Sequence, residues 1–266
     1  MIVIGDRLNA TRASVRNALI NRDKDFFLNE IKAMQEAGVD FIDLNTAHSP
    51  EQELEDMLWL IELIKDNFKI SLSVDSENPK LIGSALKRIK EPGQIINSTT
   101  LKPKQYNQVF PLMLEHQADL VVLLMDDDLI PKDTEERLKL VEKLVKILET
   151  NKIPQERILV DPLVFALSTD PRNALYVQET IMGIKKNFPD LKTIAALSNI
   201  SFGLPMRRIL NRNFLAMLIP QGLDAVLLDP LDQALMSTFY ASLALSGKDE
   251  FCLNYLSAFR KNRLKE

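Results

Sequence analysis

The sequence is poor in the residues that most often bind metals or form covalent intermediates. Its 266 residues include one cysteine, Cys252, and two histidines, His48 and His116. A single cysteine excludes an internal disulfide and a cysteine-rich metal site. Neither histidine has a histidine or cysteine partner at metal-ligand spacing, so we expect no bound metal. Cys252 falls in the last predicted helix and is expected to be a small buried apolar residue.

Long apolar runs and a surplus of basic residues are also missing. The sequence has no run of 18 apolar residues, and its first residues, MIVIGDRLN, lack the apolar stretch of a secretion signal. We therefore expect a cytoplasmic protein with no membrane partner. The formal net charge is -4, whereas nucleic-acid-binding domains typically carry a basic face, so no nucleic-acid partner is expected. Walker loops, His-Glu-x-x-His motifs and nucleophile elbows are absent, which argues against the reactions that they support.

Eight short apolar runs recur along the chain, each followed by a segment with helical periodicity. Such runs are typical of parallel strands that are buried on both faces. They are Ile2–Gly5, Phe41–Asn45, Ile70–Asp75, Gln94–Ser98, Leu120–Met125, Ile158–Pro162, Thr193–Asn199 and Ala225–Pro230. Among the intervening segments, the predicted helix 25–38 ends at a glycine suited to a C-terminal cap. The predicted helix 133–150 begins with Asp133 and Glu136, which are expected to form a capping pair.

The alternation of strands and helices predicts an α/β fold with a parallel sheet. Eight such units without a linker predict that residues 1–266 form a single domain, a (β/α)8 TIM barrel. The alternative is a doubly wound open sheet, which would normally carry a glycine-rich phosphate-binding turn after its first strand. The segment Gly5-Asp6-Arg7-Leu8-Asn9 is not such a turn, so the barrel is the preferred prediction.

Carboxylate and amide side chains occur at the C-terminal end of nearly every predicted strand. Because all strands of such a barrel run in one direction, these side chains are expected to surround one opening, where the active sites of this fold lie. The main members are Asp6, Asn9, Asp43, Asn45, Asp75, Asn97, Asp161, Asn199 and Asp229. The segment Asp126-Asp127-Asp128 also follows a predicted strand. Its consecutive side chains point in different directions, so we expect a solvated lid loop there rather than a metal cluster.

A ring of carboxylates and amides without a nucleophile suits the recognition of a heteroaromatic ring. A pterin presents an amino group beside a ring N–H, and one carboxylate can accept both hydrogen bonds. Asparagine donates and accepts at once, which matches a carbonyl next to a ring N–H. In a partly buried opening each bond matters, because an unpaired polar group there costs about 1–3 kcal/mol. The alternative is that these residues only cap the helices that follow the strands.

Seven ordered segments resemble the pterin-binding methyltransferases, a family that includes methyltetrahydrofolate–corrinoid protein methyltransferases and the folate module of cobalamin-dependent methionine synthase. They are Gly5–Asn9, Asp40–Asn45, Ser73–Ser76, Ile96–Ser98, Asp161–Leu163, Ser198–Pro205 and Gly222–Pro230, the last matching at both ends. Each is weak alone, but together they span nearly the whole chain. One departure is Asp6, where the family usually has glutamate. Dihydropteroate synthase, which shares the fold, is the alternative, although its lysine- and arginine-containing phosphate-binding pattern is not evident here.

The resemblance implies a reaction, its substrates and residue roles. The family moves a methyl group between N5 of tetrahydrofolate and the cobalt of a corrinoid. Tetrahydrofolate or 5-methyltetrahydrofolate is therefore the implied substrate, and a partner corrinoid protein supplies the cobalamin. Asp75, Asn97 and Asp161 match the residues that hold the pterin edge, Asn199 matches the catalytic amide near N5, and Arg207 matches a basic residue near the substrate. The family also implies a homodimer. Further residues of the rim are Asp6, Asn9, Asp43 and Asn45.

Overall fold

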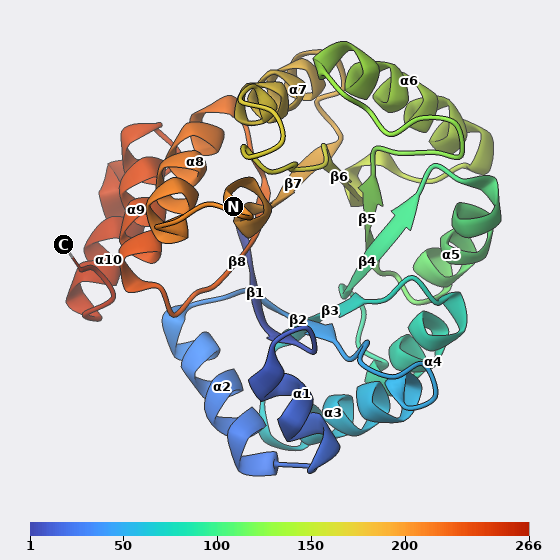
Figure 1. The fold of residues 1–266 in the computed structure, drawn as a ribbon, viewed down its shortest axis with the longest axis vertical. Helices are drawn as coiled ribbons and strands as arrows, with labels where there is room; N and C mark the ends of the chain where they lie inside the picture. Colours follow the sequence, from blue (N-terminus) through green and yellow to red (C-terminus); the bar gives the residue numbers. More distant parts are fainter. Residues whose placement is uncertain (266) are drawn as a thin grey trace.

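The structure is a computed structural model that describes residues 1–265. Its fold is a closed barrel of eight parallel strands surrounded by helices (Figure 1). Each strand pairs with the next in sequence, and β8 pairs with β1, which closes the barrel. The strands are β1 (Ile2–Asn9), β2 (Phe41–Asn45), β3 (Ser71–Asp75), β4 (Ile95–Thr100), β5 (Asp119–Leu123), β6 (Ile158–Asp161), β7 (Lys192–Ala196) and β8 (Ala225–Leu228). The predicted (β/α)8 architecture is confirmed, and the open sheet is excluded.

Helices form the outer layer around the sheet (Figure 1). They are α1 (Ala13–Ile20), α2 (Lys24–Ala37), α3 (Glu53–Asn67), α4 (Pro79–Ile89), α5 (Pro103–Glu115), α6 (Thr134–Asn151), α7 (Asn173–Asn187), α8 (Arg207–Gln221), α9 (Gln233–Leu245) and α10 (Leu253–Arg260). Short 3-10 helices occur at η1 (Gln155–Arg157), η2 (Leu197–Ser201) and η3 (Glu250–Cys252). Within residues 1–265, none of the helices combines the length and apolar character that crossing a membrane requires.

The helix ends follow the local signals in the sequence. Gly38 adopts a φ of 95°, in the left-handed region that glycine favours, and its N–H bonds back to the carbonyl of Met34 to end α2. The side chain of Asp133 accepts a hydrogen bond from the N–H of Glu136 at 3.0 Å and caps α6. The Glu136 carboxylate accepts from the N–H of Lys132 instead of Asp133. The predicted cap is therefore present, but the pair is not reciprocal.

The core has an outer layer between strands and helices and an inner layer inside the barrel. The inner layer is apolar, with members that are at most 3% exposed: Ile4, Ile95, Val121, Leu159, Ile194 and Ala225. These residues lie at the start or in the middle of their strands. The interior of the barrel is therefore filled, and only the C-terminal ends of the strands leave room for a site.

One expectation about an individual residue is wrong, and another holds only in part. Cys252 is exposed rather than buried, since it lies at the end of η3, just before α10, on the outside of the molecule. In the Asp126-Asp127-Asp128 segment, Asp127 and Asp128 are exposed as expected, but Asp126 is 8% exposed. Its carboxylate accepts from the N–H groups of Asp128 and Leu129 and pairs with Lys143. Asp126 therefore anchors the loop that follows β5.

Candidate functional site

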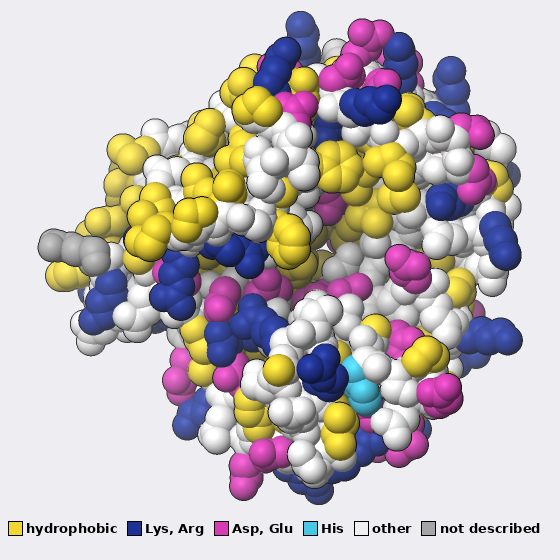
Figure 2. Space-filling model, in the orientation of Figure 1, with side chains coloured by type: hydrophobic (Ala, Val, Ile, Leu, Met, Phe, Trp, Pro, Cys, Tyr) yellow, Lys and Arg dark blue, Asp and Glu magenta, His cyan; other side chains and the backbone are white. Residues whose placement is uncertain are grey.

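The C-terminal ends of the strands surround a hollow on one face of the molecule. Figure 2 shows acidic side chains inside this hollow, near the centre of the view, with basic side chains along one side of it. All of the site residues expected from the sequence lie at this end of the barrel. They are Asn45, Asp75 and Asp161 at the last positions of β2, β3 and β6, Asp43 and Asn97 within β2 and β4, Asp6 and Asn9 in β1, and Asn199 and Arg207 after β7.

A hydrogen-bonded network of carboxylates and amides joins β2, β3 and β4. Asp43 is 2% exposed, and its Oδ1 accepts from Oγ of Ser73 at 2.7 Å and from Nδ2 of Asn97 at 3.1 Å. Further along β2, Nδ2 of Asn45 donates to Oδ2 of Asp75 at 2.9 Å. These bonds orient the Asn97 amide and the Asp75 carboxylate through the protein's own side chains, as a preorganised binding site requires.

Burial raises the pKa of both carboxyl groups in this network. For Asp43 the largest cause is loss of solvation and the next is the charge of Asp75, whereas hydrogen bonds from Ser73 and Asn97 lower the pKa. For Asp75, loss of solvation raises the pKa and the hydrogen bond from Asn45 opposes it. Carboxylates with raised pKa values that line an opening are a frequent feature of functional sites. Donors on a ligand would compensate these groups for their lost solvation.

Asp161 lies on the other side of the barrel, at the end of β6. It is 8% exposed, and its Oδ1 accepts from the N–H of Leu163 at 2.7 Å. Loss of solvation raises the pKa of Asp161 to about 6, opposed by that hydrogen bond and by the charge of Arg137. Within residues 1–265, Oδ2 of Asp161 makes no hydrogen bond. The carboxylate is therefore held by one oxygen and free to accept at the other.

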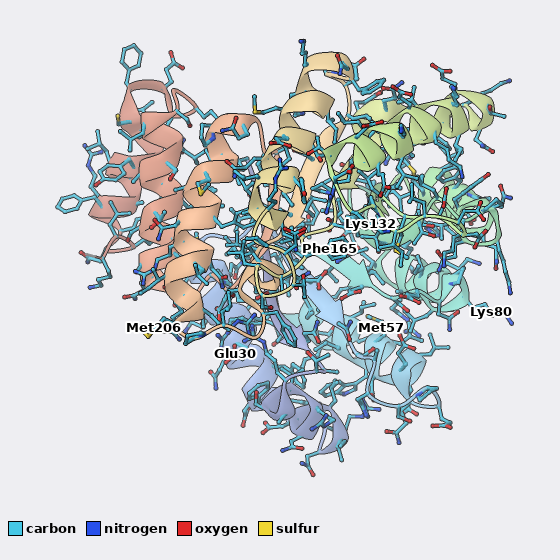
Figure 3. The ribbon with its side chains drawn as sticks, turned by 45° about the horizontal axis from the view of Figure 1, so that its top comes forward. Glu30, Met57, Lys80, Lys132, Phe165 and Met206 are labelled. Carbon is cyan, nitrogen blue, oxygen red and sulfur yellow. The ribbon has the colours of Figure 1, made fainter. Side chains whose placement is uncertain are left out.

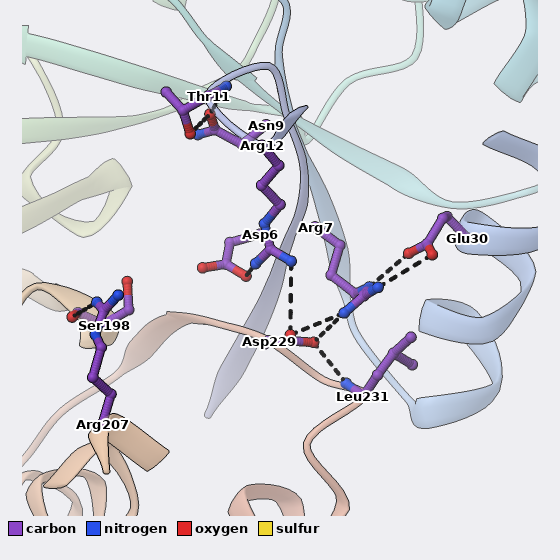
Figure 4. Close-up of polar contacts among 10 residues, drawn as sticks. All are labelled: Asp6, Arg7, Asn9, Thr11, Arg12, Glu30, Ser198, Arg207, Asp229 and Leu231. Atoms are coloured by element: carbon purple, nitrogen blue, oxygen red, sulfur yellow. Dashed lines mark hydrogen bonds and ion pairs between the residues drawn. The ribbon is translucent and has the colours of Figure 1, made fainter. Parts of the chain in front are cut away.

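Charged residues of β1 and of the segment after it form a second network with Glu30 of α2 and with Asp229, which follows β8 (Figure 4). Nε of Arg7 pairs with Glu30 at 2.6 Å, and its Nη1 lies 2.9 Å from Oδ2 of Asp229. Arg12 lies 3.3 Å from Asp6 and 3.8 Å from Asp229. Burial raises the pKa of Asp6 to about 6, and the charge of Arg12 opposes this most strongly. Glu30 could not be predicted from the sequence, because nothing in the pattern of α2 indicates that it faces Arg7.

A cavity of about 580 Å³ opens beside this network, and Asp6, Arg12 and Asn199 are among its lining residues. Asn199 is exposed, and its side chain makes no hydrogen bond within the part of the chain that the structure describes. It was expected at the end of a strand. Instead β7 ends at Ala196, and Asn199 lies in η2, because its carbonyl accepts from the N–H of Phe202 at 3.1 Å in a tight turn. The turn leaves the Asn199 amide open to the cavity.

Arg207, the first residue of α8, is bonded to both ends of this turn. Its Nη2 donates to the carbonyl of Ser198 at 2.7 Å, as Figure 4 shows, and its Nε donates to Oγ of Ser201 at 3.0 Å. Oγ of Ser201 also donates to the carbonyl of Ser198 at 3.2 Å. The guanidinium therefore closes a ring of bonds around Asn199 while it lines the same cavity.

The two histidines lie outside this arrangement. His48 lies in the loop after β2 with its side chain 5% exposed, and its Nε2 lies 2.6 Å from Oδ2 of Asp56. The other oxygen of Asp56 pairs with Arg22. His116 directly follows α5, before β5 begins at the opposite end of the barrel. Among residues 1–265, no group of three histidine, cysteine, aspartate or glutamate side chains is arranged to hold a metal ion.

Comparison with known proteins assigns the chain to a family. The family described as "Pterin binding enzyme" matches residues 5–229. The chain belongs to the pterin-binding enzymes. A methylcorrinoid:tetrahydrofolate methyltransferase from Eubacterium limosum is 32% identical over 266 residues, which cover 99% of this chain and 98% of that protein. A methionine synthase from Mycobacterium tuberculosis is 27% identical over 241 residues, which cover 85% of this chain and 20% of that longer protein.

Solved structures of other pterin enzymes share the barrel. Dihydropteroate synthase from Clostridium difficile, solved with pteroic acid, superposes with a TM-score of 0.68 at 18% identity, covering 92% of this chain and 96% of that one. The Yersinia pestis dihydropteroate synthase gives a TM-score of 0.65 at 15% identity, covering 94% and 93% of the two chains. At such identities the likeness shows the fold alone. The family that the sequence motifs indicated is confirmed by the family match and by the full-length relative.

Proposed function

We propose that the protein is a methyltransferase that moves a methyl group, in either direction, between N5 of tetrahydrofolate and the cobalt of a corrinoid carried by a separate protein. The observation that carries the proposal is the match with a methylcorrinoid:tetrahydrofolate methyltransferase along the full length of both chains. The opening of the barrel supports it, because oriented carboxylates and amides gather there in an arrangement that suits a pterin.

In this proposal Asp75, Asn97 and Asp161 bind the pterin edge. Asp161 has a free oxygen and can accept from the pterin amino group and from the neighbouring ring N–H together. Asn97 uses its Nδ2 to bond Asp43, which leaves its Oδ1 to accept from another donor of the ring. Donors of the pterin would restore hydrogen bonds to carboxylates that the fold has removed from water, which favours binding.

Asn199 is the proposed catalytic residue, because its amide faces the cavity with its donors unused. When the methyl leaves N5, the C–N bond breaks and its electron pair stays on nitrogen, which then takes a proton from solvent. A hydrogen bond from Asn199 stabilises the charge that develops there. When the methyl arrives, the same amide orients the N5 lone pair. The bound corrinoid supplies the cobalt that exchanges the methyl, and this chain contributes by positioning the folate in line.

Exchange of a methyl group between free methylcobalamin and tetrahydrofolate, followed through cobalt absorbance, tests the proposed function. We expect slow transfer with the free corrinoid and faster transfer with a corrinoid protein. The alternative is a dihydropteroate-synthase-like enzyme, since that enzyme has the same fold. It predicts condensation of a pterin diphosphate with p-aminobenzoate and no use of corrinoid. Pteroate formation without methyl transfer to or from any corrinoid would select that alternative.

Asn199→Ala should slow methyl transfer by about a hundredfold, the usual effect of removing one preorganised donor. Affinity for tetrahydrofolate should change by less than about fivefold, because the pterin edge is bound elsewhere. Single-turnover kinetics and calorimetry separate the two quantities. Asn213→Ala, an exposed asparagine of α8 that bonds the carbonyl of Ile209, is the matched control and should leave both unchanged. Equal losses of rate and affinity would place Asn199 among the binding residues only.

We also propose that the protein is a cytoplasmic homodimer. Large apolar side chains are 42–89% exposed around η3 and α10, and we call this set the C-terminal apolar surface: Leu245, Phe251, Leu253, Leu256 and Phe259. Apolar surface of this extent is typical of an interaction site. In Figure 1, α10 lies at the outer edge of the barrel, away from the opening. A single exposed cysteine suits a reducing compartment.

A further inference from the structure

A buried charge without a counter-ion lies beneath the loop that follows β6. Arg137 of α6 is 0% exposed and ranks among the largest fully buried side chains of the protein. Within residues 1–265, no ion pair links its guanidinium to a carboxylate. A guanidinium that is removed from water is unfavourable unless its N–H groups find acceptors. Its contacts should therefore indicate why the position carries an arginine.

Backbone carbonyls provide the acceptors for Arg137. Its Nε donates to the carbonyl of Pro162 at 2.7 Å and its Nη2 to that of Leu163 at 3.2 Å. Its Nη1 donates to the carbonyl of Asp133 at 3.0 Å. The guanidinium carbon lies 5.5 Å from the ring of Phe165, which Figure 3 places near the centre of the molecule. Two of the three acceptors thus belong to the residues that directly follow Asp161.

The segment that Arg137 holds is an unusual turn. Leu163 has a φ of 62°, in the left-handed region that a branched side chain rarely adopts. In this conformation the N–H of Leu163 points back to Oδ1 of Asp161 at 2.7 Å. The bonds from Arg137 to the carbonyls of Pro162 and Leu163 oppose relaxation of the turn. The direction of the Asp161 carboxylate therefore depends on a guanidinium that does not touch the opening.

The charges of the two residues are also linked. Burial raises the pKa of Asp161, and Arg137 is the one charged side chain among the causes that lower it. Burial lowers the pKa of Arg137, opposed by Asp133 and Glu136 of the N-terminal end of α6, by Tyr176 of α7 and by Asp161 itself. Removing the guanidinium should thus raise the pKa of Asp161 above about 6. At neutral pH a larger fraction of this carboxyl group would then be protonated.

We propose that Arg137 is a positioning residue for the bound pterin, because it fixes the Pro162–Leu163 turn and thereby aims the Asp161 carboxylate into the opening. The proposal rests on the proposed function only in that Asp161 binds a pterin. It assigns Arg137 two effects on Asp161, one on the direction of the carboxylate and one on its ionisation. Both are transmitted through Asp161 and neither requires contact with the ligand.

The test is the affinity for tetrahydrofolate, measured by calorimetry between pH 5 and 8, for wild type, Arg137→Lys, Arg137→Met and Asp161→Asn. Arg137→Met should weaken binding at pH 7 by more than about tenfold and move the acid midpoint of binding to higher pH by about one unit. Arg137→Lys retains the charge but reaches fewer carbonyls, so the affinity should fall while the midpoint stays near that of wild type. Asp161→Asn lacks this ionisable group, so its affinity at each pH shows the pH dependence that comes from the ligand and from the other residues.

Two further variants keep the proposal falsifiable. Arg172→Met removes an exposed arginine that lies 4.9 Å from the ring of Tyr176 but bonds none of these carbonyls, and it should bind like wild type. If Arg137→Met does not fold, Arg137→Lys combined with Asp161→Asn completes a double-mutant cycle. We expect no further loss of affinity in the double variant, and independent losses would overturn the proposal. The test measures tetrahydrofolate binding and not methyl transfer. Its result can therefore be interpreted even if the protein transfers no methyl group.

Discussion

The carboxyl groups of Asp43, Asp75 and Asp161 are ionisable groups that the fold has taken out of water, and loss of solvation is the largest cause of the raised pKa in each. A carboxyl group with a raised pKa binds its proton more tightly in the folded than in the unfolded protein. Its contribution to stability is therefore present at low pH and is lost as the pH rises through the folded pKa. For Asp161 this stabilisation is lost between pH 3.8, the ordinary pKa of an aspartate, and about pH 6, its pKa in the folded protein. At neutral pH the charged forms of these carboxyl groups are poorly solvated, so the groups contribute less to the stability of the folded protein than they do at low pH.

Asp161→Asn should separate stability from binding. The amide can still accept from the N–H of Leu163 but carries no buried charge, so the unliganded protein should be more stable at pH 7, by on the order of 1–3 kcal/mol. The gain should shrink towards pH 4, where Asp161 is protonated. Calorimetry at pH 7 should show tetrahydrofolate affinity reduced by more than about tenfold. Thermal unfolding at both pH values completes the measurement, and an unaltered affinity would remove Asp161 from the site.

At the scale of elements, the loops after β6 and β7 are shaped by arginines from the neighbouring helices. Arg137 of α6 bonds carbonyls next to Asp161, and Arg207 of α8 bonds the carbonyl and hydroxyl groups on either side of Asn199. In both cases a planar guanidinium connects acceptors that lie apart in the sequence, which an ammonium group does less well. Asp161 and Asn199, which are proposed to contact the folate, are thus positioned by turns that the two arginines hold in place.

Arg207→Ala should slow methyl transfer by more than about tenfold and change tetrahydrofolate affinity much less. The reason is that the turn carrying Asn199 loses both of its bonds to the guanidinium, and misplacing a catalytic group is costly to the rate. Single-turnover rates and calorimetry measure the two effects. Arg208→Ala is the matched control, since Arg208 lines the same cavity but makes no bond to the turn. If Arg207→Ala instead abolishes binding at an unchanged rate, Arg207 contacts the folate directly, as the sequence resemblance implied.

The elements were predictable because their signals are local. The apolar runs predict the eight strands, and the common direction of those strands predicts that Asp75, Asn97 and Asp161 share one opening. The role of Arg137 could not be predicted in this way, because its position in α6 looks like that of any other polar residue. The loop that it contacts lies 25 residues further along the chain. The strand end at Ala196 was missed for a similar reason, because bonds from Phe202 and Arg207 shape the turn.

At the scale of the whole molecule, the barrel presents two different surfaces. The opening is polar and is closed below by the apolar inner layer, so folate can enter from one side only. The C-terminal apolar surface lies on the flank, where α10 packs beside α9. A corrinoid protein must approach the opening, whereas the proposed dimer would form through the flank. The two contacts are therefore compatible, and removing one should leave the other intact.

Phe259→Glu should convert the proposed dimer to a monomer, because it places a charge in the middle of an apolar contact that would exclude water. Phe259 is 67% exposed, so the fold of the monomer has little need of its ring. Sedimentation velocity should show half the mass of wild type. Met182→Glu, at a 51% exposed position of α7, is the control and should leave the mass unchanged. Methyl transfer with free methylcobalamin should persist in both variants, since the residues of the opening all come from one chain. A wild-type protein that sediments as a monomer would contradict the dimer and leave the C-terminal apolar surface to another partner.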